Sequence, residues 1–185
     1  MLLCNKRIAT LVVLERKSSI KILGVTITDH LTMAEHVSET LNNCAQTLYA
    51  LRILKAHGMS KTAIQTVFQA VVIAKITYAT PAWWGFTSAA ERQRINDFIR
   101  RCVRSNLCSP DVKLFEEQCA VADERLFSKI ISNQDHLLYP LLPHSSTGSQ
   151  NYNLRYRTHN FELPAKTTSL IDRNFIYRML FYNCY

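Results

Sequence analysis

The stretch IKILGVTITDHLTMAEH, residues 20–36, joins a strand-like run to the start of a helix. Its first half, Ile20–Ile27, is rich in β-branched residues. A second β-branched run, Ile8–Leu14, precedes it across the charged segment Glu15–Ser19. Two such runs with a short polar connection predict a β-hairpin. Because a hairpin alone is barely stable in water, we expect it to lie on a larger body.

A helix is predicted directly after this strand. Thr32 and Glu35 have the spacing of a capping box, in which each side chain satisfies a backbone N–H of the first turn. Apolar residues then recur in steps of three and four, at Val37, Leu41, Cys44, Leu48, Leu51 and Leu54. Gly58 is expected to end this helix.

Two further helices are predicted before residue 110. Ser60 can cap the first of them, which carries Ile64, Val67, Phe68, Val71 and Val72 and is expected to end before Pro81. Ser88 and Glu91 form a second capping box for a helix that buries Ile95, Phe98, Ile99 and Cys102 and ends before Pro110. Three amphipathic helices with short connections predict a compact bundle.

The fold class predicted is therefore mainly α, with a short N-terminal β-hairpin (residues 1–30), a three-helix bundle (31–109) and a helical C-terminal extension (110–185). In the extension, a short helix is expected to start at Asp123 and run to about Asn133. A polar loop at about 144–153 is expected to be flexible. The aromatic-rich segment Ile171–Tyr182 has helical spacing and favours a docking surface over a base-stacking one.

The net charge is +8, and its distribution is uneven. Residues 1–110 hold 14 Lys and Arg against six Asp and Glu, whereas residues 111–185 hold eight of each. On the third predicted helix, Arg100, Arg101 and Arg104 project opposite the apolar stripe. The first helix ends in Arg52, Lys55 and His57, and the second begins with Lys61. Two interpretations are open: a solvated face with cations that favour helix C-termini, or contacts with phosphates.

The six cysteines include no C-x-x-C pair and no zinc-finger spacing, which favours free thiols in a reducing compartment. The N-terminus only faintly resembles a signal peptide, since its apolar run is short and no small-residue cleavage site follows it. No stretch approaches the roughly 20 apolar residues that a membrane span needs. We therefore expect an intracellular chain, cytoplasmic or nuclear, with no membrane partner.

The sequence K-I-L-G-V at residues 21–25, followed by D-H-L-T at 29–32 and H-V at 36–37, resembles the region after the catalytic core of LINE-type (non-LTR) retrotransposon reverse transcriptases. Thr77-Tyr78, Ala79 and Trp83-Trp84 are similar to a segment between later thumb helices of that family. Residues 154–157 with His159, and residues 174–178, are similar to the end of such reading frames. The resemblance covers residues 20–104 and, more loosely, 123–185.

The resemblance implies a primer-grip strand, a thumb and a C-terminal extension of an RNA-directed DNA polymerase, without the fingers and most of the palm. Reverse transcription needs paired aspartates that hold two Mg²⁺ ions, and this chain has no Asp-Asp. Asp29 is most simply a turn former, and Glu116-Glu117 lack a partner carboxylate in a palm strand. We therefore predict no catalytic or metal-binding residue here; Mg²⁺ is expected only in the missing palm.

In the family, the thumb holds the template–primer duplex through its phosphates. The resemblance therefore implies weak binding of an RNA–DNA hybrid or DNA duplex, beside the missing palm and fingers. The candidate nucleic-acid-binding residues are Lys21, Gly24, Lys55, Lys61, Arg100, Arg101 and Arg104. If about five phosphates are neutralised, the logarithm of affinity falls against the logarithm of salt with a slope of about −4.

Several alternatives stay open. Gly24 would either let a sugar-phosphate backbone approach or relieve crowding in the hairpin. Trp83 and Trp84 would either stack on bases or pack between helices. The whole chain would alternatively be a stand-alone helical protein-interaction module, or a non-functional relic of a retroelement, which cooperative unfolding would count against.

Overall fold

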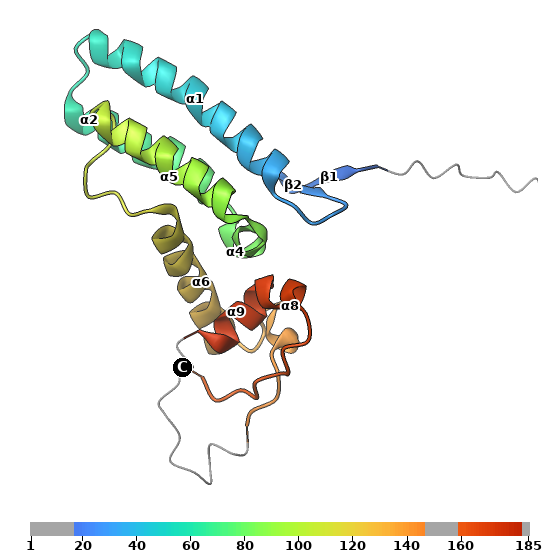
Figure 1. Ribbon diagram of the computed structural model, residues 1–185. Helices are drawn as coiled ribbons and strands as arrows, with labels where there is room; N and C mark the ends of the chain where they lie inside the picture. Colours follow the sequence, from blue (N-terminus) through green and yellow to red (C-terminus); the bar gives the residue numbers. More distant parts are fainter. Residues whose placement is uncertain (1–16, 147–158, 183–185) are drawn as a thin grey trace, which may run out of the picture.

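The computed structural model describes residues 17–146 and 159–182. It confirms a mainly helical chain that starts with a two-stranded antiparallel hairpin (Figure 1). The elements are β1 (Ser19–Ile22), β2 (Val25–Thr28), α1 (Ala34–Ala56), α2 (Lys61–Val67), η1 (Phe68–Ile73), α3 (Ala74–Ile76), α4 (Thr80–Trp83), η2 (Trp84–Phe86), α5 (Ala89–Arg104), α6 (Phe115–Ser132), η3 (Tyr139–Leu141), α8 (Ser169–Arg173) and α9 (Phe175–Phe181).

The hairpin, β1 and β2, covers the whole run that the sequence predicted as one strand and one residue more at each end. Leu23 and Gly24 form its two-residue turn, with φ values of 47° and 87°. Positive φ at both positions is the geometry of a type I′ turn, which matches the twist of two paired strands. The prediction of a single strand over Ile20–Ile27 was therefore wrong, and the expected partner strand, Ile8–Leu14, lies outside the described residues.

The predicted capping box at the start of α1 was also wrong. The N-cap position is Met33, and no side chain caps the first turn. The hydroxyl of Thr32 instead lies 2.8 Å from that of Thr28, and the Thr32 N–H donates to the Thr28 hydroxyl at 3.0 Å. Thr32 therefore connects the hairpin to the helix.

The end of α1 confirms the role predicted for Gly58. Gly58 has a φ of 88°, its N–H donates to the Lys55 carbonyl at 3.1 Å, and the Met59 N–H donates to the Leu54 carbonyl at 3.0 Å. These two bonds make a Schellman motif, which needs a left-handed residue at this position. The predicted stripe is buried at Val37, Cys44, Leu48 and Leu51, while Leu54 is exposed.

The second helix begins as predicted, because the Ser60 hydroxyl accepts from the Ala63 N–H at 3.2 Å. It runs on from α2 through the π-helical η1 to α3 and buries Ile64, Phe68 and Val72. Helical turns of α4 and η2 follow.

By length and composition alone, Lys61–Phe86 could cross a membrane, with a mean hydropathy of 1.2, so the expectation that no stretch comes near a span was too strong. We treat this run as part of the protein core.

The predicted capping box of α5 is confirmed. The Ser88 hydroxyl accepts from the Glu91 N–H at 3.2 Å, and the Glu91 carboxylate accepts from the Ser88 N–H at 2.7 Å. The helix buries the predicted set Ile95, Phe98, Ile99 and Cys102 and ends before Pro110.

The helix α6 begins at Phe115, eight residues before the predicted start at Asp123. Asn96, a buried residue of α5, explains the difference: its side-chain oxygen accepts from the Phe115 N–H at 2.9 Å, and its amide donates to Glu116 at 2.8 Å. A side chain distant in sequence therefore caps α6, which local patterns cannot reveal.

Two hydrophobic cores flank α6. The first lies between the hairpin, α1, η1 and α5 and includes Phe115 and Cys119 of α6. The second is formed by Phe127, Phe161, Ile176, Met179 and Leu180. Figure 1 shows α1 and α5 side by side, and α6 leading from them to α9 and α8.

The C-terminal segment forms two helices instead of the single one predicted. Asn174 separates α8 from α9, because its side chain accepts from the Ile176 N–H at 2.9 Å and caps α9. Phe175 packs edge-on against Phe127 of α6, so part of the aromatic tail docks on its own chain.

Most of the predicted loop at 144–153 lies outside the described residues. Four cysteines, Cys44, Cys102, Cys108 and Cys119, are buried free thiols as predicted, and Cys4 and Cys184 lie outside the description.

Candidate nucleic-acid interface

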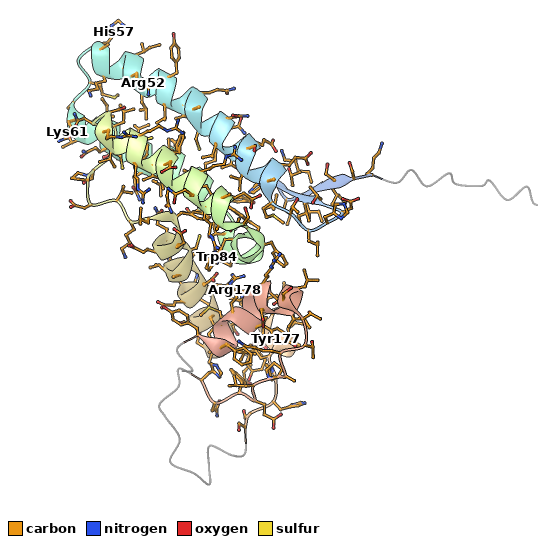
Figure 2. All side chains as sticks on the ribbon, viewed as in Figure 1. Arg52, His57, Lys61, Trp84, Tyr177 and Arg178 are labelled. Atoms are coloured by element: carbon orange, nitrogen blue, oxygen red, sulfur yellow. The ribbon has the colours of Figure 1, made fainter. Side chains whose placement is uncertain are left out.

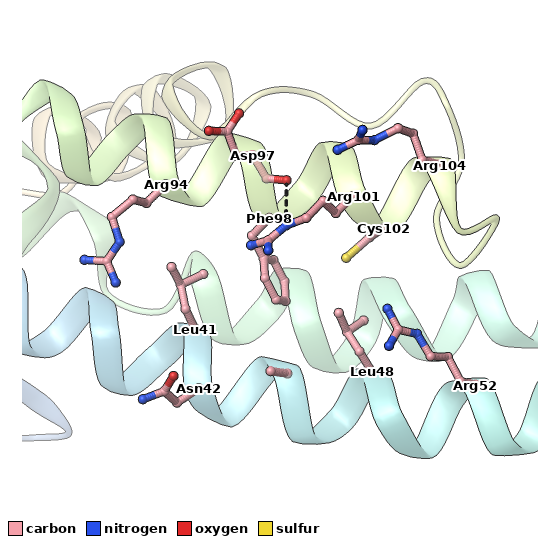
Figure 3. A pocket seen from close by; sticks show the side chains of 11 residues that line it. Leu41, Asn42, Leu48, Arg52, Arg94, Asp97, Phe98, Arg101, Cys102 and Arg104 are labelled. Carbon is pink, nitrogen blue, oxygen red and sulfur yellow. Dashed lines mark hydrogen bonds between the residues drawn. The ribbon is translucent and has the colours of Figure 1, made fainter.

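A groove of about 670 Å³ lies between α1 and α5 (Figure 3). Its floor is apolar and includes Leu41 and Leu48 of α1 and Phe98 of α5. Since this floor belongs to the first core, the groove has rigid walls made by two long helices. We call it the α1–α5 groove.

Four arginines line the α1–α5 groove: Arg52 from α1, and Arg94, Arg101 and Arg104 from α5. Among the described residues of the lining, Asp97 is the only acidic one. The three arginines of α5 are separated by seven and three residues, which places them on one face of the helix. At 1.5 Å per residue they form a row about 15 Å long.

The arginines of the groove make only weak internal contacts. The Arg94 guanidinium donates to the Ser38 hydroxyl at 3.3 Å, and Arg101 Nε donates to the backbone carbonyl of Asp97 at 3.3 Å. Within residues 17–146 and 159–182, none of the four arginines is ion-paired with a carboxylate. Their charge is therefore available to an anionic ligand.

The structure brings two of the predicted binding residues, Arg101 and Arg104, into this groove. Arg100 is not in its lining: its guanidinium lies 3.2 Å from the Asp97 carboxylate, in an exposed ion pair. Asp97 therefore offsets part of the charge that Arg100 would bring to a ligand. Exposed pairs of this kind are weak, so an anion can still compete for Arg100.

The predicted lysines Lys21, Lys55 and Lys61 are not among the described residues that line the groove. Lys55 donates to the Ser105 carbonyl at 2.9 Å and so joins the end of α1 to the end of α5. Lys61 begins α2, beside the turn that follows His57 (Figure 2). Lys21 is ion-paired with Glu39, which precedes Arg52 by 13 residues, or about 20 Å of helix. The structure thus does not gather Lys21 with the arginines.

Gly24 and the two tryptophans have roles within the fold. Gly24 holds the left-handed turn position, and a Cβ there would lie 3.7 Å from the Tyr78 ring. Trp83 is buried, stacks against Phe115 and donates to the Tyr78 carbonyl at 2.9 Å. Trp84 donates to Asp123 at 2.8 Å. These contacts favour packing over base stacking for both tryptophans.

Two arginines of the groove, Arg52 and Arg94, were not among the predicted binding residues. The signal for Arg94 was present, because it precedes Arg101 by two helical turns and therefore shares its face. For Arg52 no local signal exists, since its position depends on how α1 packs against α5.

The thiols near the groove are poor nucleophiles. Burial raises the pKa of Cys102 to about 12 and that of Cys44 to about 11. A thiol with so high a pKa has little thiolate at neutral pH. Among the residues that the structure describes, no group of three or more His, Cys, Asp or Glu could hold a metal ion.

No family model, no curated protein and no solved structure matches this chain.

Proposed function

We propose that this chain is a thumb-like segment of a retrotransposon RNA-directed DNA polymerase that grips a nucleic-acid duplex through its phosphates. The observation that carries the proposal is the α1–α5 groove, with its four arginines free of ion pairs among the described residues. The choice of the LINE-type reverse transcriptase family for this proposal rests on the order of the motifs at residues 20–37 and 77–84.

The dimensions of the arginine row suit a nucleic-acid backbone. Along one strand of a duplex, phosphates recur about every 3.4 Å of axis, so a row of about 15 Å faces about four of them. Guanidinium groups bind phosphate oxygens with two parallel hydrogen bonds. The three arginines of α5 therefore extend along about four phosphates of one strand, and Arg52 adds a fourth guanidinium from the α1 wall of the groove.

The groove offers little that would read base sequence. Phe98 is the only aromatic residue among the described residues of its lining, and its ring is buried. Phosphate contacts fix position on a duplex but carry no sequence information. We expect two duplexes of unrelated sequence to bind with equal affinity.

The test measures duplex binding by the full chain. The readout is the fluorescence anisotropy of a labelled DNA duplex and of a labelled RNA–DNA hybrid. The variants Arg52→Gln/Arg94→Gln and Arg101→Gln/Arg104→Gln each remove two charges from the groove. The control Arg125→Gln/Lys129→Gln removes two charges from exposed positions on α6. Each groove variant should weaken binding by about tenfold or more, because two phosphate contacts are lost.

The control variant should bind like the unaltered chain. Equal losses of affinity in all three variants would mean that duplex binding depends on net charge alone, and the proposal would then be wrong. Absence of duplex binding by the folded chain would also contradict it.

A further inference from the structure

We propose that a second groove, between α6 and the helical run of η1 and α3, docks an acidic amphipathic helix of a partner protein. This α6 groove has a volume of about 740 Å³. Gln69, Ile73 and Thr77 line one wall, at the four-residue spacing of a helical face. Residues 118–129 of α6 supply the other wall.

The base of the α6 groove is apolar. Ile73 on one wall and Val121, Ala122 and Leu126 on the other make this base. Val121 is 49% exposed, so an apolar side chain points at solvent inside a concave site. A ligand with its own apolar stripe would bury this surface, at about 25 cal/mol for each Å² removed from water.

The rim of the groove is cationic. Lys113, Arg125 and Lys129 line it, and no carboxylate from the part of the chain that the structure describes does. None of the three is ion-paired with a carboxylate among residues 17–146 and 159–182. Glu117 and Glu124 of α6 lie one helical turn from Val121 but are not among the residues that line the groove.

The charge and shape together identify the partner as an acidic amphipathic helix. The wall from residue 118 to 129 spans about 18 Å, the length of a helix of about 12 residues. An apolar stripe with leucines at positions i, i+3, i+4 and i+7 would meet the base, and flanking glutamates would meet the three cations.

A nucleic acid fits this groove less well. Within residues 17–146 and 159–182, its lining contains no aromatic ring on which a base could stack. A phosphate backbone would satisfy the cations but would leave Val121 and Leu126 without an apolar contact. The α6 groove therefore has a different partner from the α1–α5 groove.

The test uses the full chain and a fluorescein-labelled synthetic peptide of about 12 residues, with a leucine stripe and glutamate flanks. A scrambled peptide of the same composition is the ligand control. We expect the patterned peptide to bind and the scrambled peptide to bind at least about tenfold more weakly, because only the former presents one apolar face.

The variant Arg125→Glu/Lys129→Glu should weaken peptide binding by about tenfold or more through like-charge repulsion. Val121→Asn leaves the charge of the groove unchanged and should weaken peptide binding about fivefold, because less apolar surface is buried. The matched control is Arg52→Glu/Arg94→Glu, with the same change of charge in the other groove. Circular dichroism checks that all three variants fold.

Three results would overturn this proposal: no binding of the patterned peptide by the folded chain, equal weakening by the control variant, or displacement of the peptide by a DNA duplex from the unaltered chain. None of them depends on whether the α1–α5 groove binds a duplex. The two proposals can therefore fail separately.

Discussion

Arg178 is the residue that ties the C-terminal helices to the rest of the molecule. Its guanidinium lies 2.9 Å from the Asp123 carboxylate, stacks 4.7 Å from the Trp84 ring and donates to the Pro81 carbonyl at 3.3 Å (Figure 2). Both charged side chains are largely buried. A buried pair of this kind leaves a costly lone charge when either partner is removed.

We predict that Arg178→Met destabilises the fold more at neutral than at acidic pH. Burial raises the pKa of Asp123, and the Arg178 guanidinium opposes that rise. Without Arg178, the pKa of Asp123 in the folded state rises further above its value in the unfolded state. As the pH increases and Asp123 loses its proton, the variant therefore loses more folding stability than the unaltered protein does. Removing one partner of a buried pair costs about 3 kcal/mol when the other is charged.

The measurement is urea unfolding of both proteins at about pH 4.5 and about pH 7.5, where the difference in unfolding free energy should be larger at the higher pH. A difference that stays constant over this interval would show that Asp123 does not titrate against Arg178.

Gly85 is required because the same guanidinium lies against its backbone. A Cβ at this position would overlap Arg178 Nη1 and the Arg173 carbonyl oxygen. The carbonyl belongs to the backbone and cannot turn aside. We predict that Gly85→Ala separates α8 and α9 from the bundle and costs about 1–3 kcal/mol, the usual range for overpacking.

Hydrogen exchange of α8 and α9 measures this separation, and their amides should lose protection in Gly85→Ala. The control is Gly58→Ala, where a Cβ would meet nothing within 4 Å and the cost comes only from the positive φ. Gly58→Ala should leave α8 and α9 protected. Unchanged protection of these helices in Gly85→Ala would contradict the close packing of Arg178 against Gly85.

At the scale of the element, the two predicted capping boxes had different outcomes. Ser88 and Glu91 form the reciprocal bonds, whereas Thr32 bonds to Thr28 of the hairpin. The two sites have the same sequence signal, and the tertiary neighbour of Thr32 decides between them. Local patterns identify a possible cap but do not exclude a competing partner.

We predict that Ser88→Ala costs about 1 kcal/mol of unfolding free energy, because the Glu91 N–H loses its acceptor. Thr32→Ala should cost less than half as much, since the Thr32 hydroxyl is exposed and caps no helix. Chemical denaturation of the two variants measures both values. Equal costs would mean that the Thr32 hydroxyl is as important to α1 as Ser88 is to α5.

Sequence patterns predicted the features that depend on near neighbours. The stripe of α1, its stop at Gly58 and the buried face of α5 belong to this class, because they follow from helical periodicity and backbone preference. The start of α6 depends on Asn96, and the groove depends on Arg52 facing α5. Both are contacts between elements, and no local pattern encodes them.

For the whole molecule, α6 joins the two cores, because Phe115 packs in the first and Phe127 in the second. Asp123, between them, holds Arg178 of α9. We predict one cooperative unfolding transition, with tryptophan fluorescence and circular dichroism changing together. Two separate transitions would mean that the cores fold independently, and aggregation without a transition would favour a non-functional relic.

For the whole molecule we also propose that the α1–α5 groove binds a duplex through its phosphates. The most direct measurement is the slope of the logarithm of affinity against the logarithm of salt concentration, for the unaltered chain and for Arg101→Gln/Arg104→Gln. About four phosphate contacts predict a slope of about −3.6, and the loss of two predicts about −1.8. A slope near zero for the unaltered chain, or the same slope for both proteins, would contradict the claim.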